Sequence, residues 1–346
     1  MTSARRIPLL VLLVPCSLAC ACSAPPEEVV VEIDAGTEAS VVDGSSAIEA
    51  GVPDTGGADV LDAGHAGGVF VAVGYGGRTV RSIDDGKTWI DDQSLVASGG
   101  DDAYLLRTVL FANHQFVALG WRRMTSPDGK TWTDGGTIKN TNWFGSAVWD
   151  GAQFVGVGGY GMRATSVDAV TWLHHSIDTI ASHGKNGLTM GTGAFVSCND
   201  SGIRAHSADG KTWALSTGSA TTSGQVVFGN GVFVAFGGTT VLRSTDSGAT
   251  FQSVATLSAP VSGLVFAQGH FTALANGHVF TSQDGTTWKD DVVAGDQRGP
   301  VAFGHGYYVR IGAGGVRMRS VDARVWTDPT PNGPSNHLEM VAFGSF

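Results

Sequence analysis

One short motif recurs along the chain and constrains its architecture more than any other feature. It reads Ser-x-Asp-Gly-x-Thr-Trp in its complete form, and we call it the Ser-Asp box. Seven copies occupy residues 82–89, 126–132, 166–172, 207–213, 244–251, 282–288 and 320–326. Their closing aromatic residues follow one another at steps of 43, 40, 41, 38, 37 and 38 residues. A fixed period near 40 residues indicates a repeat architecture.

Each Ser-Asp box predicts a tight turn between two strands. The side chains of Ser207 and Asp209 can accept hydrogen bonds from backbone N–H groups of the turn. Gly210 can take the positive φ that such a turn needs. In two copies Ala169 and Ala323 stand in place of the glycine, and there we expect the turn to change its type. The closing aromatic ring then begins the next strand and can pack against a neighbouring repeat.

The remainder of each repeat predicts three more turns and four short strands, which we letter A to D, with the box joining C to D. An aromatic pair five residues apart marks strands A and B, as in Phe111/Phe116, Trp149/Phe154, Phe228/Phe233, Phe266/Phe271 and Phe303/Tyr308, with Met190/Phe195 as a variant. Seven four-stranded units predict an all-β fold, a seven-bladed β-propeller of antiparallel blades.

The two ends of the repeat region predict how the ring closes. The first repeat begins at residues 67–74, which correspond to a strand B with no strand A before it. Residues 340–346 copy a strand A with no repeat after it. We therefore expect the C-terminal strand to pair with the first blade. Such closure removes exposed sheet edges.

These motifs resemble the Asp-box (BNR-repeat) propellers of the sialidase-like superfamily. That superfamily includes sialidases, sortilin-type receptors and photosystem II assembly factors. The resemblance covers residues 67–346 and implies the fold. It says little about function, because the box is a structural turn and one fold serves many activities.

The N-terminus predicts export. Arg5 and Arg6 precede an apolar run, so residues 1–22 are typical of a signal peptide. Cysteines follow the run, and the pattern resembles a bacterial lipoprotein signal with lipid on Cys20 or Cys22. We expect a lipid-anchored protein of the bacterial cell envelope, facing the periplasm or the outside. Ordinary secretion is the alternative, because Ala-Cys-Ala also fits a cleavage site.

Residues 23–66 carry ten acidic residues and neither Lys nor Arg, which predicts a disordered acidic linker. The whole chain has a net charge of −10, whereas the propeller region 67–346, with 19 basic and 21 acidic residues, is nearly neutral. A near-neutral propeller gives no reason to expect nucleic-acid binding. We expect a monomer and no cofactor.

Propeller ligands usually sit over the central channel, on the face formed by the B–C and D–A loops, which we call the B–C face. The A–B turns and the boxes form the opposite face, the box face. Aromatic, arginine and polar residues crowd the B–C loops of the first four blades. The predicted ligand-binding residues are Tyr75, Arg78, Trp121, Arg122, Arg123, Tyr160, Arg163, Asn199, Asp200 and Arg204. Arginine also recurs just before the box serine, so part of this enrichment can be structural.

No catalytic residue is assigned. Glycoside hydrolysis needs paired carboxylates, and residues 67–346 contain a single glutamate, Glu339. The resemblance to sialidases also implies a Phe/Tyr-Arg-Ile-Pro motif, which this region lacks. Arg107, Arg298 and Glu339 could approach the channel through D–A loops, with Tyr104 near. The histidines have no compact ligand spacing, so no metal site is predicted.

We therefore expect a non-catalytic binding or scaffold module for a glycan or an envelope protein. Two alternatives stay open. One is a sialidase-like glycoside hydrolase, and the other is an assembly factor for a membrane complex.

Overall fold

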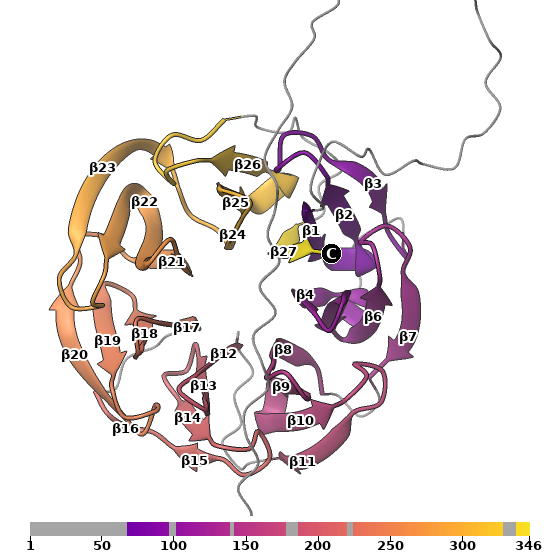
Figure 1. Cartoon of the computed structure of the whole chain (residues 1–346), viewed down its shortest axis with the longest axis horizontal. Coiled ribbons are helices and arrows are strands. Elements are labelled where there is room, and N and C mark those ends of the chain that lie inside the picture. The colour runs from indigo at the N-terminus through magenta and orange to yellow at the C-terminus, as the bar shows by residue number, and fades with distance from the viewer. Residues whose placement is uncertain (1–67, 97–101, 139–141, 178–185, 220–223, 328–336) are drawn as a thin grey trace, which may run out of the picture. The chain divides into compact units, whose positions relative to one another are not determined.

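The computed structural model describes residues 68–96, 102–138, 142–177, 186–219, 224–327 and 337–346. These residues form seven sheets arranged as a ring (Figure 1). The predicted seven-bladed propeller is confirmed. The predicted signal (1–22) and linker (23–66), including both candidate lipidation cysteines, lie outside the described residues. In the part of the chain that is described, no helix is long and apolar enough to cross a membrane.

Four blades contain four separate strands. Blade 1 consists of β27 (Leu338–Ser345), β1 (Gly68–Gly74), β2 (Thr79–Ser82) and β3 (Ile90–Gln93). Blade 2 consists of β4 (Leu106–Ala112), β5 (Gln115–Gly120), β6 (Arg122–Ser126) and β7 (Thr133–Thr137). Blade 3 consists of β8 (Phe144–Trp149), β9 (Phe154–Gly158), β10 (Met162–Ser166) and β11 (Leu173–Ile177). Blade 4 consists of β12 (Asn186–Gly191), β13 (Ala194–Asn199), β14 (Arg204–Ser207) and β15 (Ala214–Leu215).

The other three blades vary the pattern. Blade 5 consists of β17 (Val226–Gly229), β18 (Val232–Gly237), β19 (Thr240–Ser244) and β20 (Thr250–Thr256), and β16 (Thr217–Gly218) pairs in parallel with its outer strand. In blade 6, β22 (His270–Ser282) covers strands B and C between β21 (Val261–Ala267) and β23 (Lys289–Asp296). Blade 7 consists of β24 (Val301–Gly304), β25 (Tyr307–Ile311) and β26 (Arg317–Ser320), and Thr327 supplies one bridge in place of a fourth strand.

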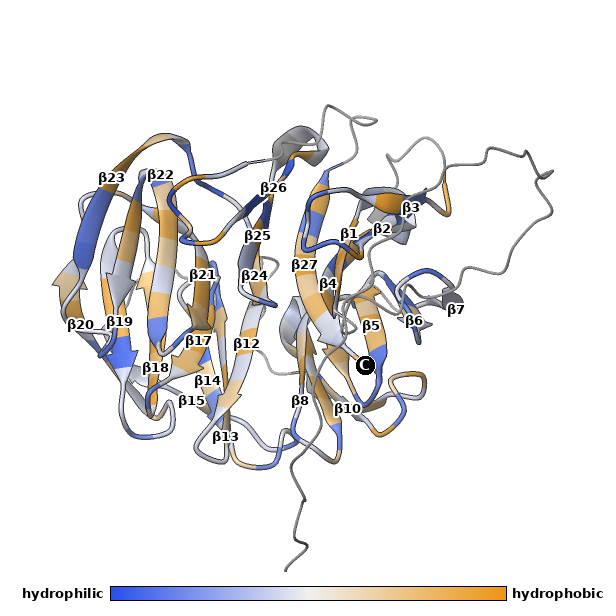
Figure 2. Cartoon of the chain, turned by 45° about the horizontal axis from the view of Figure 1, so that its top comes forward, coloured by the Kyte–Doolittle hydropathy of each residue, from blue (hydrophilic) through white to orange (hydrophobic). Residues whose placement is uncertain are grey.

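The recurring aromatic pairs hold strands A and B together. Phe111 faces Phe116 directly across β4 and β5, with ring centroids 4.9 Å apart. The equivalent pairs in blades 3, 5, 6 and 7 are also in direct register. Aromatic cross-strand pairs stabilise an antiparallel ladder. The inner strand β21 is largely apolar, whereas β23 at the rim includes a hydrophilic stretch (Figure 2).

The Ser-Asp box is the turn that the sequence predicts. In all seven copies the serine Oγ donates to the aspartate Oδ1, over 2.8 to 3.1 Å. In the copy at 207–213, Asp209 Oδ1 accepts the N–H groups of Lys211 and Thr212 at 2.8 and 2.7 Å. Ser207 Oγ accepts the N–H of Gly210 at 2.9 Å. The turn therefore satisfies its own backbone donors.

The two boxes with alanine keep the same turn, and our expectation of a changed turn type was wrong. Ala169 and Ala323 have φ of 63° and 61°, close to the 73° of Gly210. Asp168 Oδ1 still accepts two backbone N–H groups, at 2.8 and 2.7 Å. The local hydrogen bonds and the packing of the blade thus hold an alanine in the left-handed conformation that glycine adopts more easily.

Each box also joins its blade to the preceding one. A Cβ atom on Gly210 would lie 2.5 Å from a methyl group of Val155 in blade 3. Gly129, Gly248, Gly285 and Gly86 meet the equivalent valines of their preceding blades at 2.3 to 2.6 Å. At these five positions glycine adopts the positive φ without strain and leaves room for the close approach.

Ring closure follows the prediction. Strand β27 pairs antiparallel with β1, with Val69 opposite Gly344 and Ala72 opposite Val341. Figure 1 shows the yellow C-terminal strand beside the indigo N-terminal strand. The Phe343 ring packs 4.9 Å from Phe70. The ring is thus closed by strand pairing and apolar contact.

We predict acid-sensitive stability from the boxes. All seven box aspartates have a lowered pKa, because hydrogen bonds donated to each carboxylate outweigh the opposing effect of burial. The backbone N–H groups of Thr287 and Thr286 lower the pKa of Asp284 from 3.8 to about 2.

A carboxyl whose pKa is lower in the folded than in the unfolded protein stabilises the fold at pH values above the unfolded-state pKa. This stability is lost as the pH falls through the folded-state pKa. The urea midpoint should therefore decrease between pH 3.8 and about 2, and Asp284→Asn should flatten this dependence. An equal slope for the variant would contradict the prediction.

We predict that ring closure depends on Phe343. Its ring lies against Gly68, Gly304 and Phe70, so Phe343→Ala should lower the free energy of unfolding by about 2 kcal/mol. The control is Leu215→Ala on β15 of blade 4, which removes a side chain that is 55% exposed and should cost less than about 1 kcal/mol. Urea denaturation measures both. Equal losses in the two variants would show that closure does not depend on this ring.

Candidate functional site

A cavity of about 840 Å³ lies at the axis of the ring, and we call it the axial cavity. The innermost strand of every blade contributes to its wall. B–C and D–A loops bound it, so it opens on the B–C face. Its polar lining includes Tyr75, Arg107, Asp200, Asp296, Arg298 and Glu339. Its apolar lining includes Leu188, Val226, Val261, Leu264, Val301 and Met340. An apolar wall with a few polar groups is typical of ligand sites.

The two arginines of the axial cavity differ in how their charge is balanced. Arg298 donates from Nε and Nη2 to Asp296, at 2.9 and 2.7 Å, and these hydrogen bonds lower the pKa of the Asp296 carboxyl. Arg107 lies on β4, and its guanidinium stacks 4.2 Å from the ring centroid of Trp143. Its Nε is buried without a hydrogen-bond partner among the described residues. No ion pair of Arg107 occurs among the described residues, so its guanidinium is the cavity cation that can still donate to an anionic or carbonyl group.

The structure brings two of the predicted ligand-binding residues into the axial cavity, Tyr75 and Asp200. Trp121 lies beside it, with its ring 6.5 Å from that of Trp143. Tyr160 lies in the 3-10 turn η3 (Gly159–Gly161), and a Cβ on the adjacent Gly159 would lie 2.5 Å from Trp143 Nε1. These four residues thus lie in or beside one site, and their role in binding stays a prediction.

Three predicted arginines lie between blades instead. Arg123, Arg163 and Arg204 each stand three residues before a box serine. The Arg163 guanidinium stacks 4.7 Å from Trp213 of blade 4, and that of Arg204 stacks 5.4 Å from Phe251 of blade 5. Arg123 donates to the carbonyl of Val170 in blade 3 at 2.9 Å. Their positions support the structural interpretation of the arginine enrichment.

The last three predicted residues stabilise their own blades. Arg78 is fully buried and donates from Nε and Nη2 to Asp92, at 2.8 and 2.5 Å. Arg122 pairs with Asp134 and stacks on Tyr104. Asn199 is 5% exposed, and its Oδ1 accepts N–H groups of its own loop, from Ser201 and Ile203.

The D–A loops contribute more to the site than the sequence indicated. From the sequence, Arg107, Arg298 and Glu339 have a possible role only in a hydrolase, and all three line the axial cavity. Asp296 and His337 also line it and were missed. Their only sequence signal is a position just before a strand A, which brings them to the axis once the blades are arranged in a ring.

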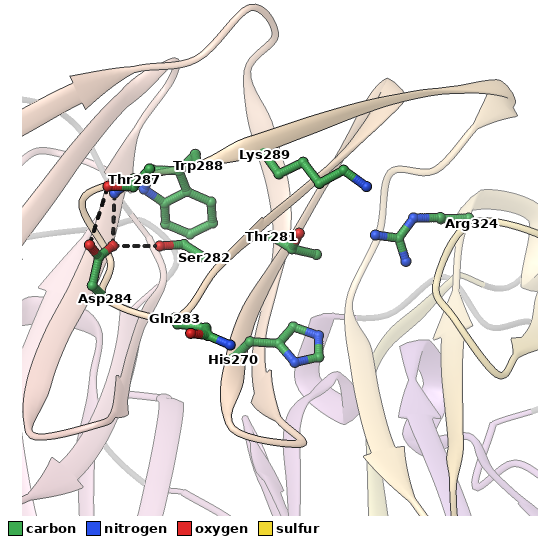
Figure 3. A pocket seen from close by; sticks show the side chains of 9 residues that line it. All are labelled: His270, Thr281, Ser282, Gln283, Asp284, Thr287, Trp288, Lys289 and Arg324. Atoms are coloured by element: carbon green, nitrogen blue, oxygen red, sulfur yellow. Dashed lines mark hydrogen bonds between the residues drawn. The ribbon is translucent and has the colours of Figure 1, made fainter.

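A second cavity, of about 630 Å³, lies on the box face between blades 6 and 7. In it the Lys289 ammonium and the Arg324 guanidinium point toward each other (Figure 3). Both pair with Asp291, at 2.9 and 2.6 Å. Thr281 directly precedes its box serine, at the position that Arg243 occupies in blade 5. The Nε of Arg243 donates to the carbonyl of Asp284 in the box of blade 6. The two cations of this cavity are already balanced by Asp291.

The described residues offer neither a reactive thiol nor a metal-binding cluster. Burial raises the pKa of the Cys198 thiol to about 12, so it remains protonated. No group of three or more His, Cys, Asp or Glu side chains in these residues is arranged to hold a metal ion.

Comparisons with known proteins support the fold. No protein-family model matches the chain, and no curated protein matches its sequence. The solved structure "YCF48 bound to D1 peptide" is similar over 72% of this chain and 87% of its own, with TM-score 0.56 and 18% identity. YCF48 from Cyanidioschyzon merolae is similar over 65% and 84%, with TM-score 0.51 and 15% identity. A catalytically inactive virginiamycin B lyase from Staphylococcus aureus, with quinupristin, is similar over 66% and 84%, with TM-score 0.56 and 9% identity. At these identities the likeness shows the propeller fold alone.

We predict that Arg204 stabilises the ring. Arg204→Gln removes the cation–π contact with Phe251 and should lower the free energy of unfolding by about 1 kcal/mol. Lys211→Gln, an exposed change in a box, is the control and should stay within about 0.5 kcal/mol of wild type. Urea denaturation measures both. Wild-type stability combined with lost ligand binding would instead make Arg204 a binding residue.

Proposed function

We propose that the protein is a binding module whose axial cavity holds a segment of a partner protein. The observation that carries this proposal is the cavity itself, with its apolar wall and the unbalanced Arg107 cation at the open end. A protein segment offers both groups that this lining can bind. Apolar side chains fit the wall, and carbonyl or carboxylate oxygens fit the guanidinium.

A protein segment suits the site better than a glycan. Sugar rings stack on exposed aromatic faces, but Trp143, one of the aromatic residues that line the cavity, is only 4% exposed and the Arg107 guanidinium already stacks on its ring. The similar structure "YCF48 bound to D1 peptide" is a propeller with a bound peptide, which supports the same class of ligand here. If the partner belongs to a membrane complex, the protein would act as an assembly factor for it.

A glycoside hydrolase of the sialidase type is the competing function. The observation in its favour is that Glu339, Asp200 and Asp296 all line the axial cavity together with Tyr75. A pair of carboxylates flanking a glycosidic bond is the usual requirement for this chemistry. Turnover of a fluorogenic glycoside that is abolished by Glu339→Gln would establish the hydrolase.

We predict that Arg107 is needed for partner binding. Arg107→Gln removes the cation but keeps a polar side chain, and the affinity should fall about tenfold. Lys211→Gln, on the box face, is the matched control and should bind as wild type does. The partner is isolated from envelope extracts on the immobilised protein, and its affinity for each variant is then measured by calorimetry. Unchanged affinity for Arg107→Gln would exclude the axial cavity as the binding site.

We also propose that the protein is exported and anchored in the bacterial envelope as a monomer through lipid on Cys20 or Cys22. The acidic linker 23–66 would then hold the propeller away from the membrane surface. Secretion without an anchor is the alternative.

We predict that one of the two cysteines is required for anchoring. Either Cys20→Ala or Cys22→Ala should abolish incorporation of radiolabelled palmitate and move the protein from the detergent phase to the aqueous phase. The other substitution should have no effect and serves as the control. Absence of label in the wild-type protein would favour secretion.

A further inference from the structure

Arg310 stands at a position that every other blade fills with a small residue. It lies on β25 of blade 7, two residues after the aromatic residue of strand B. The equivalent residues of the other six blades are all buried, and they are Ala72, Ala118, Gly156, Ser197, Ala235 and Ala273. A blade of this propeller can therefore be built without a long or charged side chain at this position.

The charge of Arg310 is buried between two blades. The residue is 8% exposed, and Tyr308, on the same face of β25, belongs to one core cluster with Leu274 of blade 6. Burial lowers the pKa of the Arg310 guanidinium, and no ion pair of Arg310 occurs among the described residues. A buried charge without an ion pair destabilises a fold unless its other contacts compensate for the lost hydration.

The contacts of Arg310 connect it to a loop of the axial cavity. Its Nη1 donates to the backbone carbonyl of Arg298 at 3.2 Å, and its guanidinium lies 5.1 Å from the ring centroid of Trp326. Its Nη2 lies 3.0 Å from the sulfur of Met318, which is a weak acceptor. Among the described residues, the Arg298 carbonyl is thus the one oxygen to which Arg310 donates.

This carbonyl belongs to the loop between β23 and β24, residues 297–300, which we call the 297–300 loop. Arg298, Gly299 and Pro300 of this loop line the axial cavity, as does Asp296, the ion-pair partner of Arg298. The Pro300 carbonyl accepts the N–H of Ile311 at 3.1 Å, which fixes the end of the loop. The hydrogen bond from Arg310 joins the middle of the loop to β25.

We propose that Arg310 is a positioning residue for the axial cavity, holding the 297–300 loop and the Arg298–Asp296 pair in the conformation that receives the partner segment. The binding part of this inference rests on the proposed function. Arg310 is not among the residues that line the cavity, so it acts through the loop. A hydrogen bond from a charged donor is roughly twice as strong as one between neutral groups, and one arginine can therefore order a short loop.

The test compares three variants of the full chain. Arg310→Met removes the donor and the charge but keeps an unbranched side chain that can pack on Trp326. Arg310→Lys keeps a charged donor on a long stem. Arg317→Met is the matched control, because Arg317 is a buried arginine of the same blade whose guanidinium lies over Trp89 of blade 1 instead.

We expect Arg310→Met to loosen the loop and weaken binding. The amides of residues 297–299 should exchange with solvent at least about tenfold faster than in the wild-type protein. The binding probe is a fluorescein-labelled peptide selected on the wild-type protein from a phage-displayed random library, and its affinity should fall at least about fivefold. Arg310→Lys and Arg317→Met should stay within about threefold of wild type in both measurements.

The melting temperature separates positioning from packing. Six blades are built without a charge at this position, so Arg310→Met should melt within about 4 °C of the wild-type protein. Loss of positioning accelerates exchange in the loop alone, whereas a general loss of stability accelerates it in all blades.

Three outcomes would overturn the proposal. Wild-type exchange in the loop of Arg310→Met would show that the arginine does not hold it. Faster exchange in every blade, with a melting temperature more than about 4 °C lower, would show that Arg310 is kept for packing. Unchanged peptide affinity beside faster loop exchange would show that binding does not need the ordered loop. If no peptide can be selected on the wild-type protein, the proposed function fails, while the exchange rates still decide whether Arg310 holds the loop.

Discussion

The contact between each Ser-Asp box and the preceding blade is the constraint on which the rest of the structure depends. The box satisfies its own backbone donors through one serine and one aspartate, so it can be compact enough to pack directly on a valine of the neighbouring blade. A propeller blade has few contacts other than those with its two neighbours. Repetition of one well-packed joint therefore sets the spacing of all seven blades, and the pairing of β27 with β1 completes the ring.

The same joint explains why arginine recurs along the chain. Arg163 and Arg204 extend from one blade over the closing aromatic ring of the next, and Arg243 reaches the carbonyl of the next box. These side chains bury their stems and charges between blades, where the aromatic rings and carbonyl groups compensate the charge.

A rigid ring leaves its B–C and D–A loops free to carry function, since the blades do not depend on their detailed sequence. The axial cavity is lined at this end by Arg107 from β4, by Trp143 just before β8, and by Tyr75 and Asp200 from B–C loops. In Tyr160, too, the backbone belongs to the common fold while the side chain is particular to its loop. Its backbone follows the conformation common to three blades, while its side chain departs from the glycine that the conformation favours.

The sequence by itself determined the fold, because the box, the aromatic pair and the incomplete first and last repeats are local signals with one geometric solution. The turn type expected at Ala169 and Ala323 was wrong, because packing there holds the left-handed turn against the local preference of alanine. The sequence selected Tyr75 and Asp200 but could not separate them from Arg163 and Arg204, since all four belong to or directly follow the same loops. Only the tertiary structure decided which side chains face the axis and which lie between blades. Whether a side chain faces the axis depends on the position of its residue relative to the next blade. Residues as distant in the sequence as Arg107 and Glu339 line one cavity only when the ring closes.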